Sequence, residues 1–216
     1  MGINTAAYQS ISKELAVKNV TLVAVSKTKP AEAVQELYNL GHRDFGENYV
    51  QELVDKEAVL PKDIRWHFIG HLQSNKVKYI APFVHLIHGV DSLSLLKEIN
   101  KQAAKNNRVI DCLLQVHIAE EETKFGFDEH ELNELPQLHE LKNIRVVGLM
   151  GMASFSDDMQ KVRGEFKKLK ALYSQWSMVN SQLSVLSMGM SADYKIAIEE
   201  GSTMVRIGSL LFGARV

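Results

Sequence analysis

The chain has 216 residues, of which 45% are hydrophobic and 24% are charged, with 25 Lys and Arg against 26 Asp and Glu. This balance is typical of a globular protein and gives no long-range field that would attract nucleic acid or an anionic membrane. The sequence has no run of 18 apolar residues, and residues 1–6 lack the basic and apolar regions of a signal peptide. The one cysteine, Cys112, has no disulfide partner within the chain. We therefore expect a cytoplasmic protein that binds neither nucleic acid nor membranes.

Short apolar or β-branched runs alternate with helical patterns along the whole chain. A helical pattern over residues 4–17 comes first. The predicted strands then follow at 21–25, 44–46, 66–70, 84–87, 111–117, 144–149, 183–186 and 203–207. The main helical patterns between them cover 31–40, 92–106, 129–141 and 158–176, and a short one follows the last strand at 209–212.

Eight strands that alternate with helices over about 200 residues predict one (β/α)8 barrel formed by residues 1–216. Several runs are apolar on both faces, as parallel strands covered by helices require. A doubly wound open sheet is the alternative, and alternation does not exclude it. We expect the N-terminal helix to take the place of a shortened eighth helix. The sequence shows no apolar stripe of the kind that obligate dimers expose, so we expect a monomer.

Lys27 is the most informative residue, because active sites of such barrels form where the strands end. It follows the first strand and continues the alternation of Val23 and Val25. A lysine here either extends to solvent or, when desolvated, becomes an amine that can form a Schiff base with a carbonyl. Lys29 has the same parity, but Pro30 suits the start of the next helix and would place Lys29 in the loop.

The C-terminal segment suggests a phosphate site. Gly208 and Ser209 follow the last strand and open a short helix, where free backbone N–H groups bind phosphate. We expect the Ser187 hydroxyl to lie beside them. An ordinary strand-to-helix turn is the alternative. Together with Lys27, these residues suggest a phosphorylated carbonyl compound.

The histidines give weaker signals. His67 and His71 are four residues apart on a predicted strand, with no evident third ligand, so we expect no metal site. We interpret His85, His88 and His117 as packed, hydrogen-bonded core residues.

Five segments, in order along the chain, resemble the pyridoxal phosphate (PLP) homeostasis proteins. They are Leu22-Val-Ala-Val-Ser-Lys-Thr-Lys-Pro30, Phe45-Gly-Glu-Asn-Tyr-Val-Gln-Glu52, His67-Phe-Ile-Gly-His-Leu-Gln-Ser-Asn-Lys76, Leu186-Ser-Met-Gly-Met-Ser191 and Gly201-Ser-Thr-Met-Val-Arg-Ile-Gly208. Members of this family are single PLP-binding barrels similar to the N-terminal barrel of alanine racemase.

The resemblance implies that Lys27 carries PLP covalently and that Arg206 meets the pyridine nitrogen. It places Ser187, Gly208 and Ser209 around the phosphate, and it places Asn48 and His71 along the ring. The chain departs from the family pattern after the sixth strand, at residues 150–155, so the contacts from that loop are not carried over.

The resemblance also implies a role in PLP homeostasis: binding, buffering or delivering this vitamin B6 cofactor, with PLP-dependent apo-enzymes as partners. Because arginine does not give up its proton, it leaves the ring a weak electron sink, which favours a carrier over an enzyme. A PLP-dependent amino-acid racemase is the alternative, with Tyr49 the tyrosine nearest a strand end. A phosphate-binding barrel without PLP is a third possibility.

Overall fold

The computed structural model describes residues 2–119, 125–133, 135 and 138–213. Eight parallel strands form a closed barrel in the order of the chain, and β1 pairs with β8 through partners such as Ala24 and Ile207. The strands are β1 (Thr21–Val25), β2 (Asp44–Glu47), β3 (Arg65–Phe68), β4 (Leu86–Val90), β5 (Ile110–Val116), β6 (Ile144–Gly151), β7 (Val185–Met190) and β8 (Met204–Ile207). The closure confirms the predicted barrel and excludes the open sheet.

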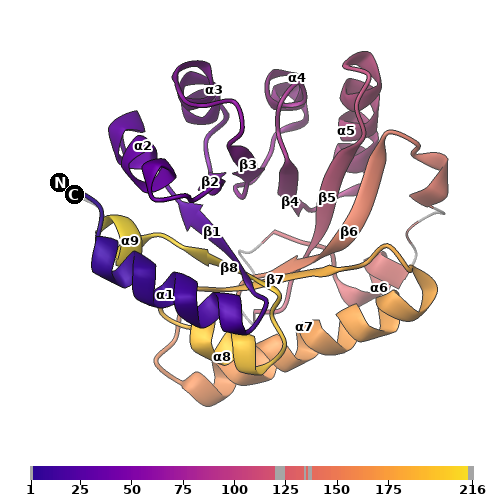
Figure 1. The fold of residues 1–216 in the computed structure, drawn as a ribbon. Coiled ribbons are helices and arrows are strands. Elements are labelled where there is room, and N and C mark those ends of the chain that lie inside the picture. Colours follow the sequence, from indigo (N-terminus) through magenta and orange to yellow (C-terminus); the bar gives the residue numbers. More distant parts are fainter. Residues whose placement is uncertain (1, 120–124, 134, 136–137, 214–216) are drawn as a thin grey trace.

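Helices surround the barrel on its outside (Figure 1). They are α1 (Thr5–Val17), α2 (Ala31–Asn39), α3 (Val50–Val59), α4 (Val77–Ile80), α5 (Leu93–Lys105), α6 (Glu129–Asn133), α7 (Met159–Val179), α8 (Tyr194–Glu199) and α9 (Ser209–Phe212). Short 3₁₀ turns occupy Ser74–Lys76 and Leu138–Glu140. Within the described part of the chain, no helix combines the length and the apolar character needed to cross a membrane.

Two apolar clusters form the core. The larger one packs the outward faces of the strands against the helices and includes Leu22, Ala24 and Leu37. The smaller one lies inside the barrel and contains Val23, Leu86, Leu113, Met150 and Met204. Alternate residues of β1 therefore belong to different clusters, as the period of two in a strand requires. This alternation places the row of Val23 in the barrel interior.

Strands β4 and β7 extend further toward the carboxyl end than the sequence predicts. The predicted strands stop at residues 87 and 186, whereas β4 continues through His88 and β7 through Ser187. Both polar side chains are fully buried, and Ser187 Oγ lies 3.3 Å from His88 Nδ1. The two partners lie 99 residues apart in the sequence, so no local pattern indicates this pairing.

The single helix predicted over residues 129–141 is wrong. Helix α6 ends at Asn133, Leu135 is not helical, and a separate 3₁₀ turn covers Leu138–Glu140. The residue before a proline disfavours the helical conformation, and Leu135 precedes Pro136.

The first and last helices meet on the outside of the barrel. The backbone N–H of Asn4 donates to the carbonyl of Leu211 at 2.7 Å, and α1 packs against α9. Figure 1 shows α1 lying alongside α9. The four-residue α9 is too short to cover its part of the barrel alone, so α1 takes the place of an eighth helix, as predicted.

Candidate functional site

The two lysines after β1 lie in different surroundings. Val23 faces the barrel interior, and Lys27 continues its alternation in the turn after the strand. Lys29 instead lines a shallow groove over α2 and α3, together with Tyr49 and Val59. Because Val59 is exposed on the outer surface, this groove lies outside the barrel. The groove places Lys29 on the outside of the barrel, whereas the alternation of β1 predicts that Lys27 continues the inward row of Val23.

A buried ionic cluster holds the turn that carries Lys27. Lys56 Nζ lies 2.7 Å from both Glu47 Oε1 and Glu52 Oε1, and it donates to the Ser26 carbonyl at 2.8 Å. The Ser26 hydroxyl donates to Glu47 Oε1 at 2.6 Å, and the Thr28 N–H donates to Glu52 Oε1 at 2.7 Å. We call these five residues the Lys56 cluster. It fixes the backbone on both sides of Lys27.

The Lys56 cluster contains two features that cost free energy. Burial raises the pKa of Glu47, although Lys56 and Ser26 stabilise its charged form, and Glu47 Oε2 is buried without a hydrogen-bond partner. Thr28 has a φ of 63°, a left-handed conformation that a β-branched residue rarely adopts. Strained residues of this kind tend to occur at functional sites.

Arg206 lies inside the barrel on β8, the neighbour of β1. Its Nη1 donates to the carbonyl and the hydroxyl of Ser187 at 3.0 and 2.6 Å, and its Nη2 donates to the Gly151 carbonyl at 3.1 Å. Burial lowers its pKa to about 10, so the side chain stays charged at neutral pH. Three of the five guanidinium hydrogens are engaged by these bonds, and the other two have no acceptor among the described residues.

The position of Ser187 differs from the prediction. Its hydroxyl is fully buried and engaged by Arg206 and His88, and the hydroxyl that contacts Gly208 belongs to Ser191. The Gly208 N–H donates to Ser191 Oγ at 3.3 Å, because β7 continues three residues beyond Ser187 and brings Ser191 to the strand end. Ser191 stands at the end of the family-like segment 186–191, so the sequence carried this signal.

Backbone groups around Gly208 form an open cradle. In the part of the chain that the structure describes, the N–H groups of Ser209 and Leu210 have no acceptor. A Cβ atom on Gly208 would lie 3.2 Å from the Val25 carbonyl oxygen, so glycine gives the closest approach to β1. Free N–H groups at such a junction suit a phosphate.

Asn48 lies just past β2, at the same level as Lys27 past β1, since Val25 pairs with Gly46. Its Oδ1 is buried and has no hydrogen-bond partner among the described residues. A Cβ on Gly70 would lie only 2.4 Å from the Asn48 carbonyl oxygen, so glycine at 70 is needed for this close packing of the β2 and β3 ends. An orphaned acceptor here fits a site completed by a ligand.

His71 lies on the rim of the barrel. Its Nδ1 is 2.9 Å from Asp91 Oδ2, and its ring stacks on Phe125 with centroids 4.3 Å apart. Sequence reasoning missed Asp91 and Phe125, because they follow β4 and β5 in loops without a motif. Tyr49 is 59% exposed beside this rim.

The other histidines divide between the interior and the surface. His88 is buried and hydrogen-bonded, which confirms its predicted role. His85 is exposed, and its prediction as a core residue is wrong, because β4 begins one residue later. His117 lies past the end of β5 and is only partly buried. Among the described residues, no three His, Cys, Asp or Glu side chains come together as a metal site.

Comparisons with known proteins identify the family of this chain. The alanine racemase N-terminal domain family matches residues 5–216. The pyridoxal phosphate homeostasis protein of Aquifex aeolicus is 48% identical over 197 residues, which cover 90% of this chain and 86% of the relative. The corresponding protein of Escherichia coli is 38% identical over 203 residues, which cover 92% and 87%.

Solved structures give the same result. PipY of Synechococcus elongatus with PLP bound is 37% identical with a TM-score of 0.83, and the match covers 90% of this chain and 93% of that one. An alanine racemase of Bartonella henselae, 18% identical with a TM-score of 0.69, shares the fold over 99% of this chain and 60% of its own. By sequence and by structure, this chain belongs to the pyridoxal phosphate homeostasis protein family.

Proposed function

We propose that this protein binds PLP at the carboxyl end of its barrel, with a covalent link to Lys27, and that it buffers or delivers the cofactor inside the cell. The observation that carries the proposal is that Lys27 directly follows β1 and Arg206 lies on the neighbouring strand β8, beside the open N–H groups after Gly208. A cofactor with an aldehyde, a phosphate and a ring nitrogen needs these three kinds of group. PLP supplies an electrophilic carbonyl and an electron-accepting ring when it is bound.

Each side chain has a distinct task in this proposal. Lys27 supplies the amine, and the Lys56 cluster holds its turn in place. Ser191 and the N–H groups of Ser209 and Leu210, next to Gly208, hold the phosphate, so Ser191 replaces Ser187 in the set expected from the sequence. Asn48 and His71 flank the ring, as expected, and Arg206 donates to the ring nitrogen from below.

The charge of Arg206 favours a carrier over an enzyme. With a pKa of about 10, Arg206 keeps its proton at neutral pH and donates only a hydrogen bond. A ring nitrogen held in this way stays unprotonated and withdraws electrons weakly. Tyr49, considered as a base for racemisation, is exposed on the rim. We therefore propose PLP-dependent apo-enzymes as recipients of the cofactor and assign no catalytic residue.

Borohydride reduction tests the covalent link. Purified protein is incubated with PLP and reduced, and intact mass and peptide mapping locate the pyridoxyl group. We expect one adduct on Lys27 that is lost in Lys27→Ala and kept in Lys29→Ala, the matched lysine of the same turn. An adduct spread over surface lysines, or no adduct, would mean that the barrel binds a different phosphate.

A second experiment separates the carrier from a racemase. The PLP-loaded protein is mixed with a PLP-dependent apo-enzyme, and recovery of its activity is followed beside a scan of L-amino acids for racemisation. We expect transfer of the cofactor without turnover. Turnover of one amino acid that depends on Lys27 would replace the carrier with a racemase.

A further inference from the structure

A line of hydrogen bonds crosses the interior of the barrel below the candidate site. Arg206 Nη1 lies 2.6 Å from Ser187 Oγ, which lies 3.3 Å from His88 Nδ1. His88 Nε2 lies 2.9 Å from His67 Nδ1, and His67 Nε2 lies 3.1 Å from Asp44 Oδ1. We call these five buried residues the lumen chain. It runs from β8 through β7 to β4, β3 and β2, so the contact between Ser187 and His88 bridges opposite walls of the barrel.

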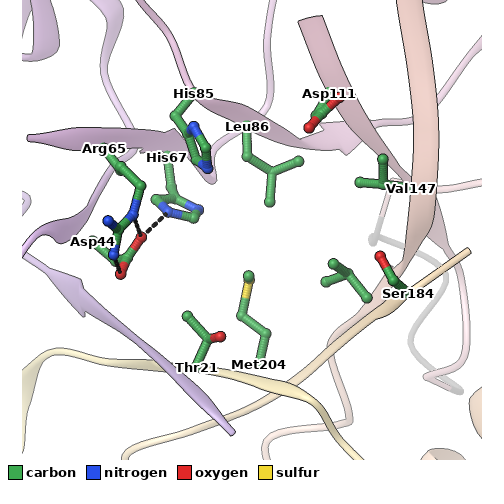
Figure 2. A pocket seen from close by; sticks show the side chains of 11 residues that line it. Thr21, Asp44, Arg65, His67, His85, Leu86, Asp111, Val147, Ser184 and Met204 are labelled. Atoms are coloured by element: carbon green, nitrogen blue, oxygen red, sulfur yellow. Dashed lines mark hydrogen bonds and ion pairs between the residues drawn. The ribbon is translucent and has the colours of Figure 1, made fainter.

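The lumen chain ends in a pocket at the opposite end of the barrel from Lys27. This pocket has a volume of about 270 Å³ and is lined largely by residues at the starts of the strands. Figure 2 shows Asp44, Arg65 and His67 on one side of it and Asp111 on the other. The chain therefore links the amino-end pocket to Arg206.

The hydrogens of the lumen chain have one consistent direction. Arg65 Nε donates to Asp44 Oδ1 at 2.7 Å and its Nη2 contacts Oδ2, and these bonds with His67 hold the pKa of Asp44 below its usual range despite burial. A charged carboxylate only accepts, so His67 Nε2 must carry a hydrogen. With Nδ1 of a neutral His67 as acceptor, His88 donates from Nε2, and its own Nδ1 accepts from the Ser187 hydroxyl.

Hydrogen bonds that ran in the opposite direction, from His67 through His88 to Ser187, would leave the Ser187 hydroxyl hydrogen without an acceptor. If His67 were doubly protonated, His88 would have to donate from Nδ1 to Ser187. Arg206 already donates to that oxygen, so the Ser187 hydrogen would have no acceptor in the described interior. An unsatisfied buried donor is costly, and the reverse state would also add a positive charge between Arg65 and Arg206.

We propose that the lumen chain is a directed hydrogen-bond chain, and that Asp44, His67 and His88 are positioning residues that hold Arg206, through Ser187, against the ring of the bound cofactor. This inference rests on the proposed PLP site. In this arrangement each acceptor of the lumen chain receives its hydrogen from the side of Arg206. The last acceptor is the negatively charged carboxylate of Asp44. Aligned dipoles of this kind stabilise a buried cation whose hydrogen-bond acceptors are two carbonyls and a hydroxyl.

The direction of the chain can be tested without any cofactor. Long-range ¹H–¹⁵N NMR spectra of ¹⁵N-histidine-labelled protein distinguish protonated from unprotonated ring nitrogens. We expect both His67 and His88 to carry their hydrogen on Nε2 at pH 7.5. A hydrogen on Nδ1 of either ring, or a doubly protonated His67, would overturn the inference.

The effect on Arg206 is tested with two matched variants of the amino-end pocket. Asp44 pairs with Arg65, and Asp111 pairs in the same way with Arg145 through Nε at 2.7 Å, but only Asp44 belongs to the lumen chain. We expect Asp44→Asn to weaken PLP binding about 5-fold, a change within the range of energetic coupling between distant residues of one protein. We also expect it to shift the absorbance of the bound cofactor. Asp111→Asn should leave both unchanged. Equal effects of the two variants would overturn the coupling.

Ser187→Ala provides a second test in case the Asp44→Asn variant does not fold. It removes the link to Arg206 but leaves the contact between His67 and Asp44 intact. We expect a similar loss of PLP affinity with an unchanged ring hydrogen on His67. Unchanged PLP affinity in Ser187→Ala would contradict the coupling. Failure of the wild-type protein to bind PLP would instead contradict the proposed function, while the NMR result would still decide the direction of the chain.

Discussion

Lys56 and Arg206 are both buried cations near the carboxyl end of the barrel, and the structure neutralises them differently. Lys56 lies within 2.7 Å of two carboxylates, whereas the hydrogen bonds of Arg206 go to neutral oxygens. Lys56 holds the backbone beside Lys27, and two hydrogens of Arg206 have no acceptor among the described residues. If Arg206 binds the cofactor as proposed, the difference has a reason: a cation that only supports the structure can be paired directly with carboxylates, while one that binds a ligand needs hydrogens that no carboxylate occupies. Substitutions of the two cations and of residues near them test this difference.

Lys56→Met should cause the largest loss of stability. It leaves Glu47, which is fully buried, without its countercharge, and removing one partner of a buried pair costs about 3–5 kcal/mol. Urea unfolding measures this loss. Lys18→Met is the control, because Lys18 forms an exposed pair with Glu14 and should change stability by less than about 0.5 kcal/mol. The double variant Lys56→Met, Glu47→Gln should recover part of the lost stability, because it removes the unpaired carboxylate. If it recovers none, the charge of Lys56 is not neutralised by Glu47.

Arg206→Met should destabilise the protein less than Lys56→Met does. It leaves carbonyls and a hydroxyl unpaired but no carboxylate in direct contact, which predicts a loss of about 1–3 kcal/mol by the same urea measurement. A loss equal to that of Lys56→Met would remove the distinction between the two cations.

His88 should make the protein acid-sensitive below pH 6.5. Burial, with His67 and Arg206 nearby, lowers the pKa of His88 well below 6.5, so the unfolded state binds a proton that the folded state does not. Stability is therefore full above about pH 6.5 and falls as the pH decreases, by up to about 1.4 kcal/mol per pH unit.

The variant His88→Asn should flatten this slope between pH 6.5 and 5.5 in urea unfolding, whatever its stability at pH 7. His130→Gln, at an exposed position on α6, is the matched control and should keep the wild-type slope. If both variants had the same slope, His88 would not be the source of the acid sensitivity.

Thr28→Gly should raise the free energy of unfolding slightly. Glycine adopts the φ of 63° without strain, and this gain exceeds the added freedom of the unfolded chain by about 0.5–1 kcal/mol. Thermal unfolding provides the measurement. Asn19→Gly is the control, because Asn19 has a φ of 54° that asparagine already tolerates, and its variant should not gain stability. A stabilised control, or a destabilised Thr28→Gly, would show that Thr28 is not strained.

The sequence predicted local order well and long-range polar pairing poorly. The alternation of apolar runs is a local property, and it identified the barrel. The burial of His88 was predicted, but its partner Ser187 lies 99 residues away, and no local pattern indicates that pairing. The same holds for Lys56 on α3, a helix that the sequence analysis did not identify, where a lysine resembles any solvated helical residue. The sequence analysis ended this strand at residue 186, whereas β7 continues to Met190 and brings Ser191 to the strand end. Ser191 was therefore not expected beside Gly208.

The contact between α1 and α9 also has a mechanical consequence. The first and last strands of the barrel are parallel neighbours, paired through four registered positions from Thr21 with Met204 to Ala24 with Ile207. A force that pulls α1 and α9 apart acts on the start of β1 and the end of β8, in opposite directions along parallel strands. The hydrogen bonds of this seam are then loaded together in shear instead of being opened one by one, so the barrel resists extension most strongly where its sheet closes.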